Sequence, residues 1–278
     1  MKFTCTSWSW SLLAFEDVVD VMSRMFGLNA IDVGAFPGWA HFEPEDLIVR
    51  PDEYAARLHE CADRFGVQYT DMIMTFKPDY TVHCVNDPDP AIRATNVETF
   101  KSLCEFCVKA NIPGLTLLPG IVHDSLGHDA SLALSIEGFT PLAAIAKDAG
   151  LRISFEPHVG SITQTPDDAL KVVKAVDHLT FTLDYAHFAC QGYSDEQVHP
   201  LLEYTGHYHM RQARKGENQC RTNEGTIDFD AILTRLKMLN YTGWCAYEYV
   251  WEQWEDNDRV DVMCETLTLK KQLEKFED

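Results

Sequence analysis

Basic residues are scarce in this chain. Its 278 residues include 23 Lys and Arg against 43 Asp and Glu, which gives a formal net charge of −20. Affinity for DNA or RNA comes largely from Lys and Arg side chains that neutralise phosphates. The charge balance therefore argues against a nucleic-acid partner and against an anionic membrane surface. No stretch approaches the roughly 18 apolar residues of a membrane span, and no long apolar run follows Met1-Lys2 as in a targeting segment.

Cysteine motifs with regular spacing are also missing. The nine cysteines are an odd number and form no disulfide framework. The single CxxC, Cys104 to Cys107, falls inside an expected helix over Ile92–Ala110 and has no second CxxC partner. We therefore expect packed free thiols, and reduced cysteines indicate the cytoplasm. A Gly-rich loop with Lys before a helix is absent as well, which favours an unphosphorylated substrate.

The chain does contain a regular alternation of short apolar runs and longer amphipathic ones, which is typical of βα units around a parallel sheet. Eight such units can be counted, with strands expected at Phe3–Trp8, Ala30–Ala35, Gln68–Thr75, Gly114–Leu118, Leu151–Glu156, Leu179–Asp184, Gly206–Met210 and Trp244–Glu248. This predicts a single (β/α)8 TIM barrel that forms one catalytic domain over residues 1–278. A doubly wound open sheet is the alternative, but no G-x-G-x-x-G follows the first strand.

The amphipathic runs between the strands predict helices. They are expected at Glu16–Phe26, Pro51–Phe65, Ile92–Ala110, a segment ending near Ala149, a segment beginning at Pro166, and then at Asp195–Tyr204, Phe229–Leu239 and Arg259–Phe276. Thr165 is suited to cap the helix that begins at Pro166, since its hydroxyl can accept from a first-turn N–H.

Four consecutive predicted strands, the fifth to the eighth, end on metal-capable side chains. These are Glu156, Asp184, His209 and Glu248. A lone strand-end carboxylate is usually a helix cap or an ion-pair partner, but the carboxyl ends of barrel strands meet around one mouth, where active sites lie. Three carboxylates and one imidazole make a hard ligand set. We expect one divalent ion, with Mn²⁺ fitting best, Mg²⁺ or Co²⁺ also suitable, and Zn²⁺ less so.

Several motifs resemble those of the xylose isomerase-like barrels grouped as sugar phosphate isomerases/epimerases, whose close relatives include ketose 3-epimerases. The segments are Leu183-Asp184-Tyr-Ala-His187, His207-Tyr-His209 and Gly225-Thr-Ile-Asp228-Phe229. The resemblance covers essentially the whole chain. It specifies the superfamily well and the substrate poorly.

The resemblance implies roles for individual residues. Glu156, Asp184, His209 and Glu248 would bind the metal, with Glu156 and Glu248 also acting as the acid/base pair. Residues expected to bind the substrate are His187, His158, Arg214 and Trp8. In the ketose epimerases a substrate-binding Arg follows the metal His by six positions, whereas Arg214 follows His209 by five, so a solvated loop is the alternative for Arg214.

Aromatic residues follow the first two strands and the eighth. Trp8, Trp10, Phe36 and Trp39 are suited to stack on sugar C–H faces or simply to pack under the loops, and Trp251 and Trp254 to cover the same mouth. His158 could bind a substrate oxygen, or it could orient Glu156 without contacting the substrate.

These features favour a divalent-metal-dependent isomerase or epimerase that acts on a keto-sugar or related polyol through a metal-stabilised enediolate. The alternative is a lyase of the same fold that uses the same metal and enolate, similar to inosose or dehydroshikimate dehydratases or to enzymes that cleave 3-keto-glycosides. An abasic-site endonuclease also uses this barrel, but the −20 charge argues against it. A non-catalytic binding barrel would not need four ligands. The expected partner is a small sugar or cyclitol, and homo-oligomerisation is compatible with the sequence.

Overall fold

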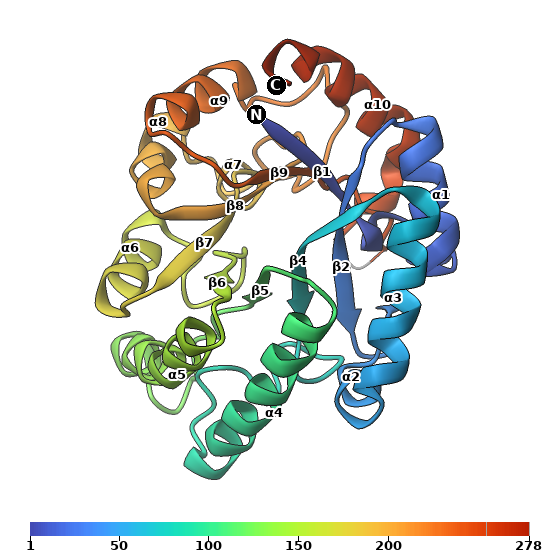
Figure 1. Ribbon diagram of the computed structural model, residues 1–278. Coiled ribbons are helices and arrows are strands. Elements are labelled where there is room, and N and C mark those ends of the chain that lie inside the picture. The colour runs from blue at the N-terminus through green and yellow to red at the C-terminus, as the bar shows by residue number, and fades with distance from the viewer. Residues whose placement is uncertain (254, 278) are drawn as a thin grey trace.

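The computed structural model describes residues 1–253 and 255–277. Within these ranges, eight parallel strands close into a ring, because the first strand pairs with both the second and the last (Figure 1). The ring consists of β1 (Lys2–Thr6), β2 (Ala30–Phe36), β4 (Gln68–Met74), β5 (Gly114–Leu117), β6 (Arg152–Phe155), β7 (Leu179–Asp184), β8 (Thr205–Met210) and β9 (Trp244–Tyr247). The predicted (β/α)8 barrel is confirmed. A short strand that the sequence did not predict, β3 (Ala40–His41), pairs antiparallel with β2.

Helices surround this ring on the outside (Figure 1). The main ones are α1 (Phe15–Met25), α3 (Pro51–Phe65), α4 (Pro90–Lys109), α5 (His128–Asp148), α6 (Pro166–Ala175), α9 (Phe229–Met238) and α10 (Val262–Leu273). Shorter pieces are α2 (Pro44–Val49), α7 (Ala186–Ala189), α8 (Asp195–Val198) and the 3-10 turns η1 (Ser7–Trp10), η2 (His199–Tyr204), η3 (Asn257–Arg259) and η4 (Glu274–Phe276). Thr165 caps α6 as predicted, accepting from Asp168 N at 3.2 Å.

Several predicted elements end earlier than their sequence pattern indicated, and two of them illustrate the cause. The first strand stops at Thr6, where the chain turns into η1 and the Thr6 and Ser9 hydroxyls lie 2.7 Å apart. The helix expected over Asp195–Tyr204 is α-helical only to Val198 and continues as the 3-10 turn η2. Pro200 lies at the start of that turn and has no N–H to donate to an α-helical ladder.

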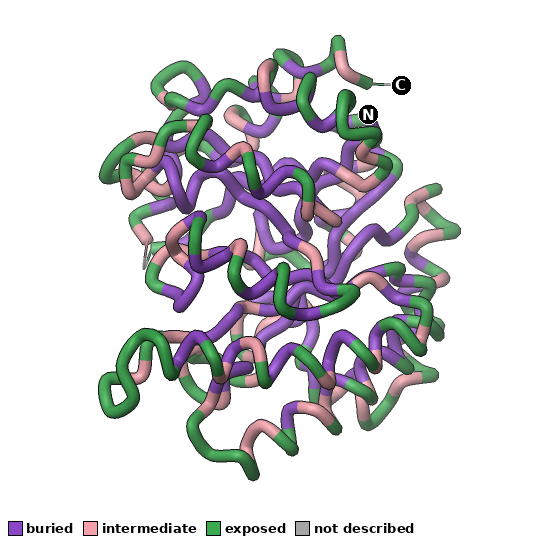
Figure 2. Tube along the Cα trace, turned by 90° about the vertical axis from the view of Figure 1, so that its left-hand side faces the viewer, coloured by how far each residue is buried: buried purple, intermediate pink, exposed green. Residues whose placement is uncertain are grey.

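The main apolar core lies between the strands and the inner faces of the helices. Figure 2 shows buried residues along the strands and exposed residues along the outer sides of the helices. The cysteines are all free thiols, and Cys104 and Cys107 are buried on α4, consistent with packing. Among the described residues no helix combines the length and apolar character needed to cross a membrane.

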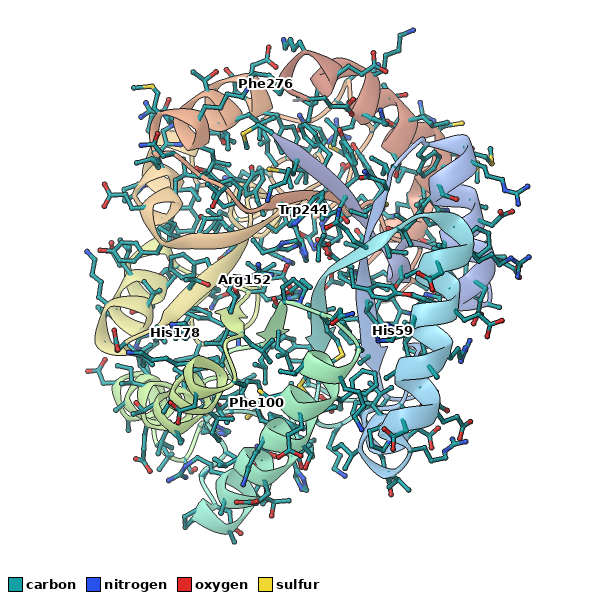
Figure 3. The ribbon with its side chains drawn as sticks, viewed as in Figure 1. His59, Phe100, Arg152, His178, Trp244 and Phe276 are labelled. Carbon is teal, nitrogen blue, oxygen red and sulfur yellow. The ribbon has the colours of Figure 1, made fainter. Side chains whose placement is uncertain are left out.

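The inside of the ring is polar rather than aliphatic near its amino-terminal end. Figure 3 labels Arg152, which comes from β6 and lies inside the ring. Arg152 donates to Asp71 on β4 at 2.6 Å and to the Thr70 carbonyl at 3.1 Å. The Thr116 hydroxyl donates to the other oxygen of Asp71. This network, which we call the basal pair (Asp71 and Arg152), closes the barrel below the functional site.

Candidate active site

Three of the four predicted metal ligands meet at the carboxyl ends of their strands. His209 Nδ1 lies 3.2 Å from Glu156 Oε1 and 2.9 Å from Glu248 Oε2. The two glutamates directly follow β6 and β9, and their backbone N–H groups extend the strand pairing by donating to Leu117 O and Met210 O. Since the strands are fixed in the ring, these side chains are held by rigid elements. We call Glu156, His209 and Glu248 the ligand cluster.

Asp184, the fourth predicted ligand, ends β7 beside this cluster and is held by an arginine. Its Oδ2 accepts from Arg211 Nε at 3.0 Å, and its Oδ1 accepts from the backbone N–H of Ala186 at 2.8 Å. Arg211 Nη2 also lies 3.2 Å from His187 Nε2. Arg211 was not predicted as a site residue by itself, although its position two residues after His209 indicates the same side of the strand.

The other ring nitrogen of His209 is directed to a second buried carboxylate. His209 Nε2 lies 3.8 Å from Asp32 Oδ2, and the same oxygen lies 2.7 Å from His207 Nε2. Asp32 comes from β2 at a point where the pairing with β4 shifts its register, which re-aims side chains. The Thr70 hydroxyl donates to the remaining oxygen of Asp32. A lone aspartate within the apolar run Ala30–Ala35 was the sequence signal for this group.

Burial and charge shift several pKa values in the site. Burial raises the pKa of Asp184 to about 7, against the opposing effect of Arg211. Burial alone would also raise the pKa of Glu248, but His209, and after it Arg211 and the Trp8 indole, lower it to about 2. Burial would lower the pKa of His209, yet Glu248 and Glu156 raise it well above its usual value. Perturbed groups gathered in one cavity are typical of functional sites.

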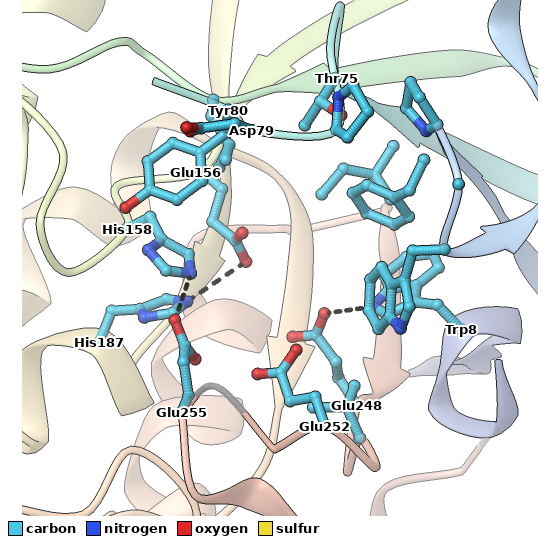
Figure 4. Close-up of a pocket in the computed structure, with 18 of the residues that line it drawn as sticks. Trp8, Thr75, Asp79, Tyr80, Glu156, His158, His187, Glu248, Glu252 and Glu255 are labelled. Atoms are coloured by element: carbon cyan, nitrogen blue, oxygen red, sulfur yellow. Dashed lines mark hydrogen bonds and ion pairs between the residues drawn. The ribbon is translucent and has the colours of Figure 1, made fainter. Parts of the chain in front are cut away.

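A cavity of about 470 Å³ opens above the ligand cluster (Figure 4). Its polar lining consists of Thr75, Asp79, Tyr80, Glu156, His158, His187, Arg211, Glu248, Glu252 and Glu255. Its apolar lining consists of Trp8, Phe36, Pro37, Trp39, Ile73, Pro78, Leu118 and Val250. This size is within the range of small-molecule binding sites.

Three of the four predicted substrate-binding residues line this cavity. The Trp8 indole donates to Glu248 Oε1 at 3.0 Å, which leaves Glu248 Oε2 facing the cluster. The rings of His158 and His187 lie 3.9 Å apart, and His158 Nε2 is 3.5 Å from Glu255 Oε1. Burial lowers the pKa of His187 well below its usual value, so this imidazole is neutral.

Arg214 does not lie where the resemblance placed it. It is half-exposed, pairs with Glu217 at 2.8 Å and Glu224 at 3.6 Å, and is absent from the described residues that line the cavity. The alternative of a solvated loop therefore fits Arg214, because Arg211 points inward and Arg214 falls in the following turn. Trp251 is exposed and does not line the cavity, and Trp254 lies outside the described residues.

The donor groups fit a divalent cation. Ligand atoms of Glu156, His209 and Glu248 all lie within 4.8 Å of one another. Glu248 Oε2 and His209 Nε2 are buried and make no hydrogen bond of good geometry to the described residues, although Glu248 Oε2 lies 2.9 Å from His209 Nδ1. Two further groups meet the same distance limit, Asp32 with His207 and His209, and Glu156 with His158 and His187. The carboxylates of Glu156, Asp184 and Glu248 outnumber the two cationic groups beside them, Arg211 and a protonated His209, and a bound cation would supply the missing positive charge.

The chain matches the xylose isomerase-like TIM barrel family over residues 23–269 and belongs to it. It is similar to inosose dehydratase of Salmonella typhimurium, with 27% identity over 146 residues, 43% of this chain and 47% of that protein. It is also similar to an uncharacterized protein of Methanocaldococcus jannaschii, with 25% identity over 63% of this chain and 67% of that protein. The chain spans about half the length of the inosose dehydratases that it matches.

Solved structures share the fold at lower sequence identity. A D-psicose 3-epimerase with D-tagatose from Clostridium cellulolyticum H10 superposes with a TM-score of 0.75 at 16% identity, covering 99% of both chains. The IOLI protein with a bound zinc atom superposes with a TM-score of 0.74 at 19% identity, covering 99% of this chain and 97% of that one. The expected resemblance to isomerase/epimerase barrels is thus confirmed at the level of fold and family.

Proposed function

We propose that this protein is a divalent-metal-dependent isomerase or epimerase of a keto-sugar or related polyol. The observation that carries the proposal is the placement of two carboxylates, Glu156 and Glu248, on either side of His209 Nδ1 at the bottom of one cavity. Glu156 approaches from the side of His187 and Glu248 from the side of Trp8 (Figure 4). An acid/base pair for epimerisation needs this arrangement, in which two groups face opposite sides of one carbon.

Glu156, Asp184, His209 and Glu248 would hold the cation. When bound, it would supply positive charge that polarises a ketone and its neighbouring hydroxyl and so acidifies the adjacent C–H. One glutamate then removes that proton to give an enediolate, and the other delivers a proton to the opposite face. The neutral His187 is placed to hydrogen-bond a substrate oxygen. Mn²⁺ is the metal that we propose, since the ligand set is mostly oxygen. The similarity of fold to D-psicose 3-epimerase supports this reading.

A lyase is the second candidate, and two observations favour it. Several curated relatives are inosose dehydratases. In addition, Glu252 lines the same cavity, and burial raises its pKa to about 8, so that it carries a proton at neutral pH. After a glutamate removes the C–H proton, the electron pair would form a carbon–carbon double bond. The leaving group would depart with its bonding electrons and take the proton of Glu252.

Proton NMR in D₂O distinguishes the two reactions. The Mn²⁺-loaded protein would be incubated with ketohexoses, 3-keto-glucosides and inosose, and metal and protein removed before spectra are recorded. Deuterium next to the carbonyl with the skeleton and oxygen count retained supports isomerase or epimerase action. Loss of water or of an aglycone with a new vinylic signal supports the lyase.

Glu156→Gln and Glu248→Gln are the matching variants. Each amide keeps the shape of the side chain but cannot take a proton, so we expect turnover to fall by on the order of 10³-fold. Turnover that survives either change would refute the acid/base assignment. Metal content, measured in parallel, separates a lost base from a lost ligand.

A further inference from the structure

The cavity has two chemically different walls. One is polar and includes Glu156, Glu248 and His187. The other, which we call the apolar wall, consists of Trp8, Phe36, Trp39, Ile73 and Val250. Figure 4 shows Trp8 across the cavity from His158 and His187. A monosaccharide held at the ligand cluster presents mostly hydroxyl groups, so it gives the second wall little to bind.

The apolar wall is a separate, pre-formed cluster rather than an extension of the main core. Buried Trp8, Ala40, Ile73 and Val250 contact one another, and the half-buried rings of Phe36 and Trp39 pack on them. The Phe36 ring lies 5.7 Å from Trp8 and 4.9 Å from Trp39, between centroids. Phe36 thus joins the rings of Trp8 and Trp39 into one aromatic surface.

Glycine at position 34 keeps this wall in place. A Cβ atom there would lie 3.2 Å from Trp8 Cε3, closer than side chains normally pack. With hydrogen alone at Gly34, the Trp8 side chain packs close to β2 while its indole N–H reaches Glu248. Trp8 therefore belongs to the apolar wall and also contacts Glu248 of the polar wall. A ligand bound at the ligand cluster would for this reason lie next to the apolar wall.

The cavity is also larger than a six-carbon sugar requires. Such a sugar has roughly twelve non-hydrogen atoms, and even at the roughly 30 Å³ that one water molecule occupies in the liquid it would fill at most about 360 Å³. The cavity measures about 470 Å³. The space left over lies against surface that gains most by contact with an apolar group.

Charge narrows the identity of that group. Asp79 and Glu255 line the cavity, whereas Arg211, its lone Lys or Arg among the described lining residues, is engaged by Asp184. A phosphate or carboxylate in the extra space would meet carboxylates without a free cation, and an ammonium group would lose its hydration against apolar side chains. The group is therefore expected to be uncharged.

We propose that the apolar wall is a second subsite that binds a flat, uncharged aromatic group attached to the keto-sugar, as in an aryl glycoside. This inference rests on the proposed function, because the ligand cluster must hold the sugar part. The apolar wall, named by Trp8, Phe36, Trp39, Ile73 and Val250, then stacks on the aromatic group and leaves the reacting carbon at Glu156 and Glu248.

Two probes that differ only in the attached group test the proposal: phenyl and methyl 3-keto-β-D-glucopyranoside. Binding would be measured by calorimetry on the Mn²⁺-loaded Glu156→Gln protein, so that turnover does not interfere and any effect on the sugar part is common to both probes. We expect the phenyl glycoside to bind about tenfold more tightly, since stacking on aromatic side chains adds to apolar burial. Equal affinities would overturn the subsite.

Variants at the wall provide the control. Adding Trp39→Ala should bring the phenyl to methyl ratio to about one, since the ratio cancels any effect on the shared sugar part, and Phe36→Leu should lower the ratio while keeping an apolar side chain. Trp244→Ala is the matched control, because Trp244 lies at the opposite end of the barrel beside Lys2 and Arg152. A ratio that is unchanged by both wall variants would overturn the proposal.

The same probes separate this inference from the proposed function. With wild-type protein in D₂O, deuterium exchange on the methyl glycoside reports the chemistry alone. Preference for the phenyl group without any exchange or elimination would retain the subsite and refute the proposed function. Exchange together with equal affinities for the phenyl and methyl glycosides would support the proposed function and refute the subsite.

Discussion

Two aspartate–arginine pairs lie inside this barrel at different depths. In the basal pair, Arg152 donates to Asp71 at 2.6 Å, and the second oxygen of Asp71 accepts from Thr116. At the mouth, Arg211 donates to Asp184 at 3.0 Å. Both pairs join neighbouring or nearby strands, and in both the aspartate is buried.

Their surroundings differ. Thr116 and the Thr70 carbonyl complete most of the hydrogen bonds of Asp71 and Arg152, although the buried Arg152 Nε has no partner among the described residues. Arg211 instead lines an open cavity together with Glu156 and Glu248, so the pair of Asp184 and Arg211 lies among further carboxylates. A pair with most of its hydrogen bonds made stabilises the fold, whereas a cluster of like charges is retained for what it binds. The comparison predicts that equivalent changes at the two levels have opposite consequences.

The largest effect is expected from Asp184→Asn. It removes a proposed ligand but leaves an amide oxygen for Arg211, so activity should fall by on the order of 10³-fold, more than the 10–100-fold typical of outer residues around a metal. The unfolding free energy of the metal-free protein should stay the same or rise, because Glu248, Glu252 and Glu255 still compensate Arg211 while one of several mutually repelling carboxylates is removed. Steady-state kinetics and urea unfolding on the same samples measure both quantities. A clear loss of stability would mean that Asp184 stabilises the fold, as we expect for Asp71 of the basal pair.

Asp71→Asn should show the reverse pattern. Breaking a buried pair leaves the partner charge uncompensated, which costs about 3 kcal/mol. The activity of the molecules that remain folded should be nearly unchanged, because Asp71 does not line the cavity. Asp177→Asn is the control: it breaks the exposed pair with Lys147, and its unfolding midpoint should match wild type. A large drop in kcat with normal stability would contradict the structural role.

Asp32→Asn tests the buried carboxylate that lies beside His207 and His209. Asp32 Oδ2 lies 2.7 Å from His207 Nε2 and 3.8 Å from His209 Nε2, so its charge favours the orientation of the His209 ring that presents Nδ1 to the two glutamates. An amide orients this ring less strongly, and the metal affinity should fall 10–100-fold. Competition with a chelating dye measures the affinity without need of a substrate. Unchanged affinity would show that the packing of His209 alone is sufficient.

The smallest effect is expected for Glu252, a cavity residue that makes the stability of the protein depend on pH. Burial, and after it Glu255, raises the pKa of Glu252 to about 8. The folded protein therefore holds a proton that the unfolded chain releases near its ordinary pKa, so this group makes stability fall as pH rises from about 4.5 to 8. Glu252→Gln should flatten this slope, by no more than about 1.4 kcal/mol per pH unit. Urea unfolding at pH 5 to 9 measures it, and an identical slope in the variant would refute the shift.

Much of the fold was predictable because it follows from local hydrophobic patterns in the sequence. Short apolar runs alternate with amphipathic ones, and strand positions such as Leu179–Asp184 agree with the structure residue for residue. Errors occurred where a single residue interrupts the pattern, as at Pro200, which ends the α-helix of its segment. The short strand β3 was missed because two residues carry no periodicity.

The sequence by itself determined that Glu156, Asp184, His209 and Glu248 follow consecutive strands, and parallel strands place such ends at one mouth. Only the tertiary structure decided which distant side chains complete the site. Arg211 rather than Arg214 reaches Asp184, Asp32 crosses from β2 to His209, and Trp8 reaches Glu248. These contacts join residues up to 240 positions apart. They depend on ring closure and on shifts of strand register, which alternation within a single strand does not encode.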